Sequence, residues 1–155
     1  MTRINTISVE HLERAHLVAE YKELTQFIHL VEKRLDKNDA FSDLPRHYTL
    51  DTGHCRFFFN KGTYLANRFT QLKDEILRRN IKVDIDGYNT RLKRITSVYT
   101  RSKRINKDYI PTKQAKLINI DRILLRIKAK PHLYSDGAYE RLHTLRGDIY
   151  HDRLK

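Results

Sequence analysis

Two glutamates and a histidine near the start of the chain have the residue types and the spacing that proton transfer requires. Glu20 and Glu23 follow His16 at helical intervals, so the three side chains would share one stripe of a helix. That stripe borders the apolar one, where partial burial of a carboxylate raises its pKa toward the range of proton transfer. Helical geometry alone does not choose between the two glutamates. Ordinary solvated residues at the edge of a core show the same spacing.

A second reactive group is the α-amine that removal of Met1 would expose on Thr2. The reference pKa of an α-amine is about 7.7–8.0, well below that of a lysine side chain. Part of such an amine is therefore neutral and nucleophilic at physiological pH, and Arg3 with other cations would lower its pKa further. The same residues are equally compatible with a chain terminus that has no chemical role.

The overall charge favours a polyanionic partner. Lys and Arg number 31 against 19 Asp and Glu in 155 residues, which gives a net charge of +12 and indicates nucleic acid. No stretch approaches the roughly 20 apolar residues of a membrane span, so no membrane partner is expected. Cys55 is the only cysteine, which fits a reducing, cytoplasmic compartment. The sequence contains no metal-binding or nucleotide-binding motif, so neither a metal nor another cofactor is predicted.

Apolar periodicity predicts three main helices. The first covers residues 8–36, with a possible break before His16, and the second covers residues 63–79. The third lies between Pro111 and Pro131. Their apolar stripes are Leu17, Leu24, Ile28, Val31 and Leu35; Leu65, Phe69, Leu72 and Ile76; and Leu117, Ile120, Leu124 and Ile127. On the third helix, Arg122 and Arg126 lie opposite the stripe and are expected to face outward.

The remaining segments are expected to be loops or short elements. Residues 38–56 predict a long ordered loop, and the three phenylalanines at 57–59 are interpreted as core packing that leads into the second helix, although locally they resemble a strand. The basic segment 84–108 is compatible with a helix or with a mobile loop. A short helix is expected near 139–146. The prediction is an all-α, compact single domain with long ordered loops.

Several of these residues resemble the phage pyrimidine-dimer DNA glycosylases, the family that includes the enzyme called endonuclease V. The resemblance covers residues 1–135, which leaves 136–155 as a C-terminal extension of unknown structure. It is carried by Met1-Thr2-Arg3-Ile4-Asn5, His16-Leu17-x-Ala19-Glu20-Tyr21-x-Glu23-Leu24, Gly53-His54, Phe57-Phe58 and Asp108-Tyr109-Ile110-Pro111. The chain departs from the family pattern at Lys22 and at Thr25-Gln26, where the family has Arg and Pro-Arg, and it contains no Trp.

The resemblance implies a metal-independent DNA glycosylase that is also an abasic-site lyase. In such enzymes the terminal amine, here that of Thr2, attacks C1′ of the damaged nucleotide, and β-elimination from the resulting imine breaks the strand. The resemblance selects Glu23 as the general acid/base. The residues expected to contact DNA are Arg3, His16, Lys22, Lys33, His54, Arg122, Arg126 and Lys130.

The expected partner is damaged or modified double-stranded DNA, bound by a monomer. For a phage-encoded enzyme, the compartment would be the cytoplasm of the bacterial host. Two alternatives remain open at this point. The same chemistry could act on another damaged or modified base, or the chain could be a basic DNA-binding module without catalytic activity.

Overall fold

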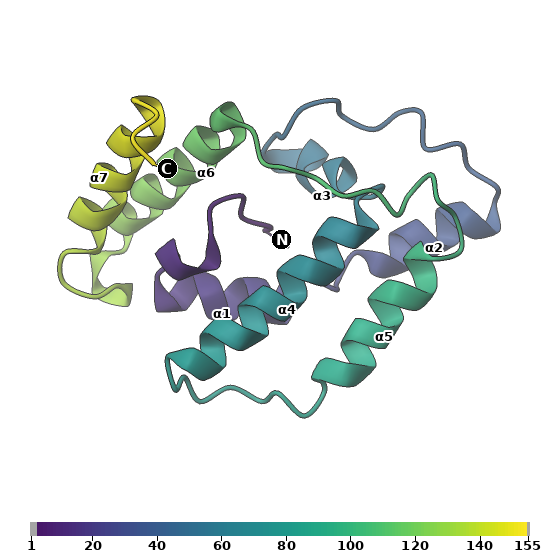
Figure 1. Cartoon of the computed structure of the whole chain (residues 1–155), viewed down its shortest axis with the longest axis horizontal. Coiled ribbons are helices and arrows are strands. Elements are labelled where there is room, and N and C mark those ends of the chain that lie inside the picture. The colour runs from purple at the N-terminus through teal and green to yellow at the C-terminus, as the bar shows by residue number, and fades with distance from the viewer. Residues whose placement is uncertain (1–2, 155) are drawn as a thin grey trace. The chain divides into compact units, whose positions relative to one another are not determined.

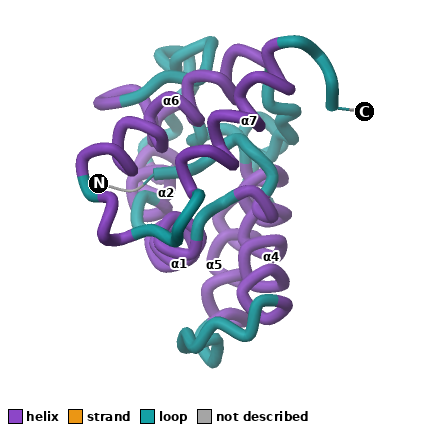
Figure 2. The backbone as a smooth tube through the Cα atoms, turned by 90° about the vertical axis from the view of Figure 1, so that its left-hand side faces the viewer, coloured by secondary structure: helices purple, strands orange, loops and turns teal. Residues whose placement is uncertain are grey.

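The chain folds entirely into helices and loops. The computed structural model describes residues 3–154, and within that range it contains α-helices and short 3₁₀ turns but no β-strand (Figures 1 and 2). The predicted all-α class is confirmed. None of the described helices is long and apolar enough to cross a membrane.

The described residues divide into two compact units. One comprises residues 3–4 and 18–109, and the other comprises residues 5–17 and 110–154. The boundary between them runs through helix α1 (Arg14–Glu23). The expected count of three main helices is wrong, because the first predicted helix is interrupted and because the basic segment and the C-terminal tail each form a helix.

The first predicted helix is interrupted twice. A 3₁₀ turn (Val9–His11) precedes α1, in agreement with the break expected before His16. A second interruption at residues 24–27 separates α1 from α2 (Ile28–Asp36) and was not predicted. Leu24 and Phe27 remain buried within this turn, so the apolar stripe continues across it without revealing the break.

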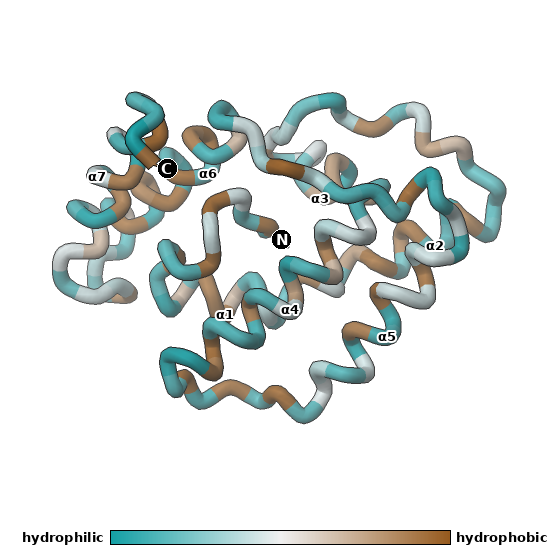
Figure 3. Tube along the Cα trace, viewed as in Figure 1, coloured by the Kyte–Doolittle hydropathy of each residue, from teal (hydrophilic) through white to brown (hydrophobic). Residues whose placement is uncertain are grey.

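Helix α4 (Gly62–Arg78) forms the core of the first unit. The four residues of its predicted stripe, from Leu65 to Ile76, are completely buried. Helix α5 (Tyr88–Tyr99) packs alongside α4 and also contacts α2, and in Figure 1 it runs beside α4. Along both helices apolar and polar positions alternate at helical spacing (Figure 3). At Gly62 a side chain would have no room, because a Cβ there would lie 2.3 Å from Cγ of Tyr99.

The three consecutive phenylalanines fill the core of the same unit. A 3₁₀ turn (Asp51–Gly53) leads directly into the one-turn helix α3 (His54–Phe57), so the preceding loop is shorter than expected. Phe57, Phe58 and Phe59 are all buried, which confirms their interpretation as core packing. The Phe58 ring stacks on that of Tyr64, with 5.7 Å between the ring centroids.

The second unit is built on two helices that lie side by side. Helix α6 (Lys113–Ala129) is capped by Thr112, whose hydroxyl accepts a 3.1 Å hydrogen bond from the backbone N–H of Ala115. A 3₁₀ turn (Pro131–Leu133) ends it and is followed by α7 (Ala138–Tyr150). Helix α7 is longer than the helix expected at 139–146, because Ala138 and Ile149 continue its buried side beyond both ends of that range.

Candidate active site

The two glutamates of the predicted stripe have different environments. The side chain of Glu20 is fully buried and forms a bidentate ion pair with Arg68 of α4, whose side chain is only 4% exposed. The guanidinium Nε and Nη2 donate to the two carboxylate oxygens at 2.9 and 3.0 Å. Both charged groups are thus withdrawn from solvent and occupied by each other, which gives Glu20 a structural role.

Glu23 is the last residue of α1 and is half-buried. Among the residues that the structure describes, its carboxylate makes no hydrogen bond and no ion pair. Glu23 therefore retains both oxygens for a ligand, in a position only partly open to water.

The main chain that leads back to the predicted nucleophile is anchored by a histidine. The backbone N–H of Ile4 donates to Nε2 of His54 at 2.8 Å, and the hydroxyl of Tyr48 donates to the Ile4 carbonyl at 3.3 Å. The other ring nitrogen of His54 donates to the carbonyl of Thr49 at 2.9 Å. These two bonds fix the neutral tautomer in which Nε2 is the acceptor. Thr2 itself lies outside the described residues.

In the second unit, the residues that follow Ile4 are anchored to α6. The side-chain carbonyl of Asn119 accepts hydrogen bonds from the backbone N–H groups of Thr6 and Ile7 at 2.7 and 3.3 Å. The Thr6 hydroxyl donates to the carbonyl of Ala115 at 3.0 Å, and Asn119 donates to the side-chain oxygen of Asn5 at 2.8 Å. Asn5, Thr6 and Asn119 are buried, so this hydrogen-bond network is protected from water.

Arg91 of α5 binds the C-terminal end of α1, where Glu23 is located. Its Nη2 donates to the carbonyls of Tyr21 and Lys22 at 2.6 and 3.0 Å, and to the Thr25 hydroxyl at 3.2 Å. The guanidinium also lies against the Tyr21 and Phe69 rings, 5.0 and 4.7 Å from their centroids. Burial lowers the pKa of Arg91 below its ordinary value.

The other residues expected to contact DNA occupy different environments. Those with exposed side chains are Arg3, Lys22, Lys33, Arg126 and Lys130. His16 is half-buried in the second unit, and its ring stacks on Tyr134 with 5.3 Å between the centroids.

One of the predicted DNA contacts is buried, and another does not face outward as predicted. His54 is only 2% exposed, and its ring bonds to the main chain, so it supports the chain instead of presenting a surface to DNA. Arg122 does not face outward beside Arg126, because it is half-buried and donates a hydrogen bond to Asn5.

Sequence reasoning missed Tyr48 and Arg91, since neither has a local pattern that indicates its distant partner.

One lysine in the first unit has an unusual ammonium environment. Lys61 lies over the Phe57 ring, with Nζ 3.7 Å from the centroid, and donates to the Phe57 carbonyl at 2.6 Å. Burial, with a smaller effect of Lys107, lowers the pKa of Lys61 to about 8. Lys61 is thus a second amine of the chain with a pKa near that of an α-amine.

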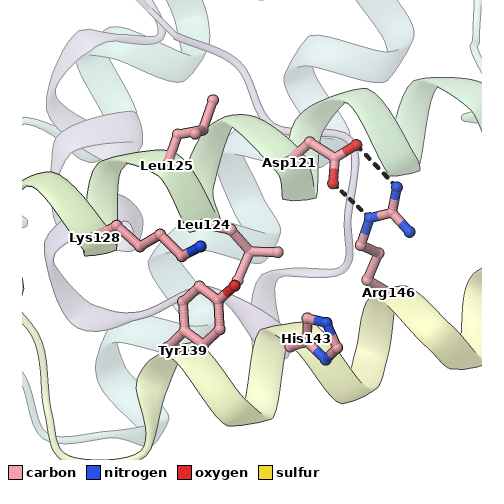
Figure 4. Close-up of a pocket in the computed structure, with 7 residues that line it drawn as sticks. All are labelled: Asp121, Leu124, Leu125, Lys128, Tyr139, His143 and Arg146. Atoms are coloured by element: carbon pink, nitrogen blue, oxygen red, sulfur yellow. Dashed lines mark hydrogen bonds and ion pairs between the residues drawn. The ribbon is translucent and has the colours of Figure 1, made fainter.

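A surface hollow of about 350 Å³ lies between α6 and α7 in the second unit (Figure 4). Its charged groups are already engaged: Asp121 pairs with Arg146 at 2.5 Å, and the Lys128 ammonium lies 5.1 Å from the centroid of the Tyr139 ring. None of the predicted site residues lines it. Among residues 3–154 there is no cluster of three or more His, Cys, Asp or Glu side chains that could hold a metal ion.

The N-terminal part of the chain, which contains both glutamates of the candidate site, matches a known protein family. Residues 1–89, more than half of the chain, match the sequence model of the pyrimidine dimer DNA glycosylase family. The chain belongs to this family. Membership implies a glycosylase that acts on pyrimidine dimers in damaged DNA. Glu20, Glu23 and His54 lie within the matched residues, whereas α6, α7 and nearly all of α5 lie beyond them.

Proposed function

We propose that this protein is a pyrimidine-dimer DNA glycosylase and abasic-site lyase whose nucleophile is the α-amine of Thr2 and whose general acid/base is Glu23. The amine attacks C1′ of the damaged nucleotide, and the bond between C1′ and the base breaks, so that the base leaves. The sugar ring opens to an imine, which acidifies the C2′ proton. Removal of that proton leads to β-elimination, which breaks the C3′–O bond. The strand on the 3′ side of the site then leaves with its 5′-phosphate.

The availability of Glu23 is the observation that carries this proposal. General acid/base work needs a carboxylate that is partly desolvated and not already bound to a cation. Glu23 meets both conditions, since it is half-buried and makes no ion pair within the described chain. Glu20, three residues earlier, meets only the first, because Arg68 occupies both of its oxygens.

The anchoring of Ile4 supports the role given to Thr2. Two residues of extended chain span at most about 7 Å, so a fixed Ile4 limits the region that the Thr2 amine can reach. His54 and Tyr48 hold both polar groups of the Ile4 peptide within the unit that also contains Glu23. A nucleophile held in this way needs less ordering when the substrate binds.

The proposed reaction also requires the target nucleotide to leave the duplex. A base in the stack is out of reach of an amine, so the enzyme must flip the nucleotide at a cost of a few kcal/mol. The net charge of +12 supplies affinity for the phosphate backbone that offsets this cost.

Borohydride trapping on abasic duplex DNA tests the proposed chemistry, because only an enzyme that forms an imine becomes covalently attached. Mass spectrometry should place the adduct on the N-terminal peptide, and retention of Met1 or acetylation of the amine should abolish it. Lys61→Met should trap as well as the parent protein. An adduct on Lys61 or another internal lysine would overturn the assignment of Thr2.

The role of Glu23 is tested by Glu23→Gln, with Glu32→Gln as a matched control. Glu32 is also a half-buried glutamate, in α2, without a partner among the described residues. Glu23→Gln should bind dimer-containing duplex like the parent but cleave it about 10²–10⁴-fold more slowly, the usual contribution of a general acid/base. Glu32→Gln should cleave at the parental rate. Equal rates in all three proteins would remove Glu23 from the mechanism.

A further inference from the structure

The segment that contains α5 is the most basic stretch of the chain. Residues 88–107 contain seven Lys and Arg residues and no Asp or Glu, and the first acid to follow is Asp108. The family match ends at residue 89, so nearly all of this segment is an addition to the matched part of the chain. The catalytic proposal above uses none of its exposed charges.

Packing decides which of these cations face solvent. The buried side of α5 is formed by Ile95, Val98 and Tyr99, which pack in the first unit with α4. Arg91 also turns inward, where it binds the end of α1. The remaining cations lie at other positions of α5 or in the loop after it, and all are exposed: Lys93, Arg94, Arg101, Lys103, Arg104 and Lys107.

Almost none of this exposed charge is neutralised by the protein. Arg101 pairs with Asp36 of α2 at 2.7 Å. The other five have no ion pair with any carboxylate of the described residues. By contrast, Arg34 and Arg56 share Asp43, and Arg78 and Arg79 share Glu75. We call Lys93, Arg94, Lys103, Arg104 and Lys107 the α5 basic surface.

Like charges at this density repel one another, and a polyanion removes that repulsion while its own counterions are released. The ligand with that chemistry for a DNA glycosylase is the phosphate backbone of duplex DNA. We infer that the α5 basic surface is a second DNA-binding surface, which holds undamaged duplex through its phosphates. This inference depends on the proposed function only because it takes DNA as the polyanion. Such contacts carry no sequence information, so the surface would retain the enzyme on DNA irrespective of damage.

The test compares two triple variants with the same loss of charge. Lys93→Gln/Arg94→Gln/Lys103→Gln removes three cations of the α5 basic surface. Lys37→Gln/Arg46→Gln/Lys82→Gln removes two lysines and one arginine that are exposed elsewhere in the same unit. Affinity for an undamaged duplex oligonucleotide is measured for both variants and the parent from about 50 to 200 mM salt. Equal melting temperatures confirm that both variants are folded.

Each phosphate contact contributes about 0.9 to the slope of log affinity against log salt, so the α5 variant should lower that slope by about 2 to 3. The control variant should lower it by less than about 1. Equal slopes in the two variants would overturn the inference, since the effect would then come from net charge alone. Borohydride trapping on abasic DNA at low salt keeps this result separate from the proposed chemistry. The α5 variant should still be trapped, and a parent protein that cannot be trapped would contradict the lyase mechanism but not the α5 basic surface.

Discussion

Nε2 of His54 accepts a 2.8 Å hydrogen bond from the backbone N–H of Ile4, which ties the start of the chain to helix α3. The bond joins residues 50 positions apart in the sequence. It is buried, so water does not compete for either group. Because Ile4 lies two residues after Thr2, His54 is a positioning residue in the proposed mechanism.

Replacement of His54 should slow imine formation more than it weakens DNA binding. His54→Phe keeps the ring contacts with Tyr48 and Phe58, but it leaves the Ile4 N–H and the Thr49 carbonyl without partners. Such buried unsatisfied groups cost about 1–3 kcal/mol each. Single-turnover trapping on abasic duplex should slow at least tenfold at saturating protein, while the affinity for that duplex stays within about twofold.

His54→Gln provides the control, since its side-chain carbonyl can accept the Ile4 N–H. It should recover part of the trapping rate lost in His54→Phe. If both variants trap as fast as the parent, the Ile4 anchor has no part in presenting the amine.

Arg91 should be required for the geometry of Glu23 as well as for stability. Arg91→Met removes the hydrogen bonds that Arg91 donates to the end of α1 and should lower the free energy of unfolding by about 1–3 kcal/mol. Cleavage of dimer-containing duplex should slow, because α1 then loses the contacts that fix its last turn. Arg91→Lys should lie between the parent and Arg91→Met, because an ammonium lacks the planar fork of a guanidinium.

Arg46→Met is the matched control for Arg91→Met, since it removes an exposed arginine elsewhere in the same unit. Chemical denaturation and single-turnover cleavage should leave Arg46→Met close to the parent. Unchanged cleavage in folded Arg91→Met would show that the end of α1 keeps its geometry without Arg91.

The interruption between α1 and α2 shows what sequence periodicity could not predict. Leu17, Leu24, Ile28 and Val31 keep helical phase and are all buried, so their spacing predicts one continuous helix. Thr25 and Gln26 are not helix breakers. Arg91, 66 residues beyond Thr25, binds the residues at this turn. Only a long-range contact of this kind distinguishes a turn from a helix here.

Where helices are marked by local signals, the sequence was a better guide. The stripe from Leu65 to Ile76 predicted α4 to within one residue at each end, and Asn80 takes the positive φ of 52° expected of a residue after a helix. Helix α5 could not be predicted from an apolar stripe, because its sequence is rich in charge and only Ile95, Val98 and Tyr99 are buried along it. The choice between Glu20 and Glu23 could not be made from spacing, because Arg68 lies on another helix.

The Glu20–Arg68 ion pair should matter for stability and not for chemistry. Glu20→Gln leaves a buried guanidinium without its counter-charge, which should lower the free energy of unfolding by about 3–5 kcal/mol. Glu20→Gln/Arg68→Met removes both charges and should cost less than the sum of the two single variants. Denaturant unfolding of the four proteins gives the coupling energy. Additive losses would contradict a direct interaction.

The alkaline limb of the stability curve should report on Lys61, provided that the tyrosines are separated from it. Burial raises the pKa values of Tyr64 and Tyr99 well above their ordinary value. Above pH 10 the unfolded chain loses these phenolic protons before the folded chain does, so the two tyrosines make stability fall as pH rises. Lys61 has the opposite sign. A comparison of two proteins that share both tyrosines cancels their contribution.

The folded-state pKa of Lys61 is about 8, against an ordinary value of 10.5, so between these values the unfolded chain binds more protons than the folded one. Stability should therefore rise with pH across this window, by less than the full pKa difference implies, because the ammonium is partly exposed and solvent screens its charge. Below pH 8 the ammonium is charged in both states and its burial cost is constant. Lys61→Met retains an apolar chain over the Phe57 ring and should lack the rise. Unfolding in guanidinium chloride at several pH values gives the difference in the free energy of unfolding between parent and variant. This difference should be constant below pH 8 and should then increase in favour of the parent up to pH 10.5. A difference independent of pH would mean that the Lys61 ammonium is as well solvated in the folded protein as in the unfolded chain.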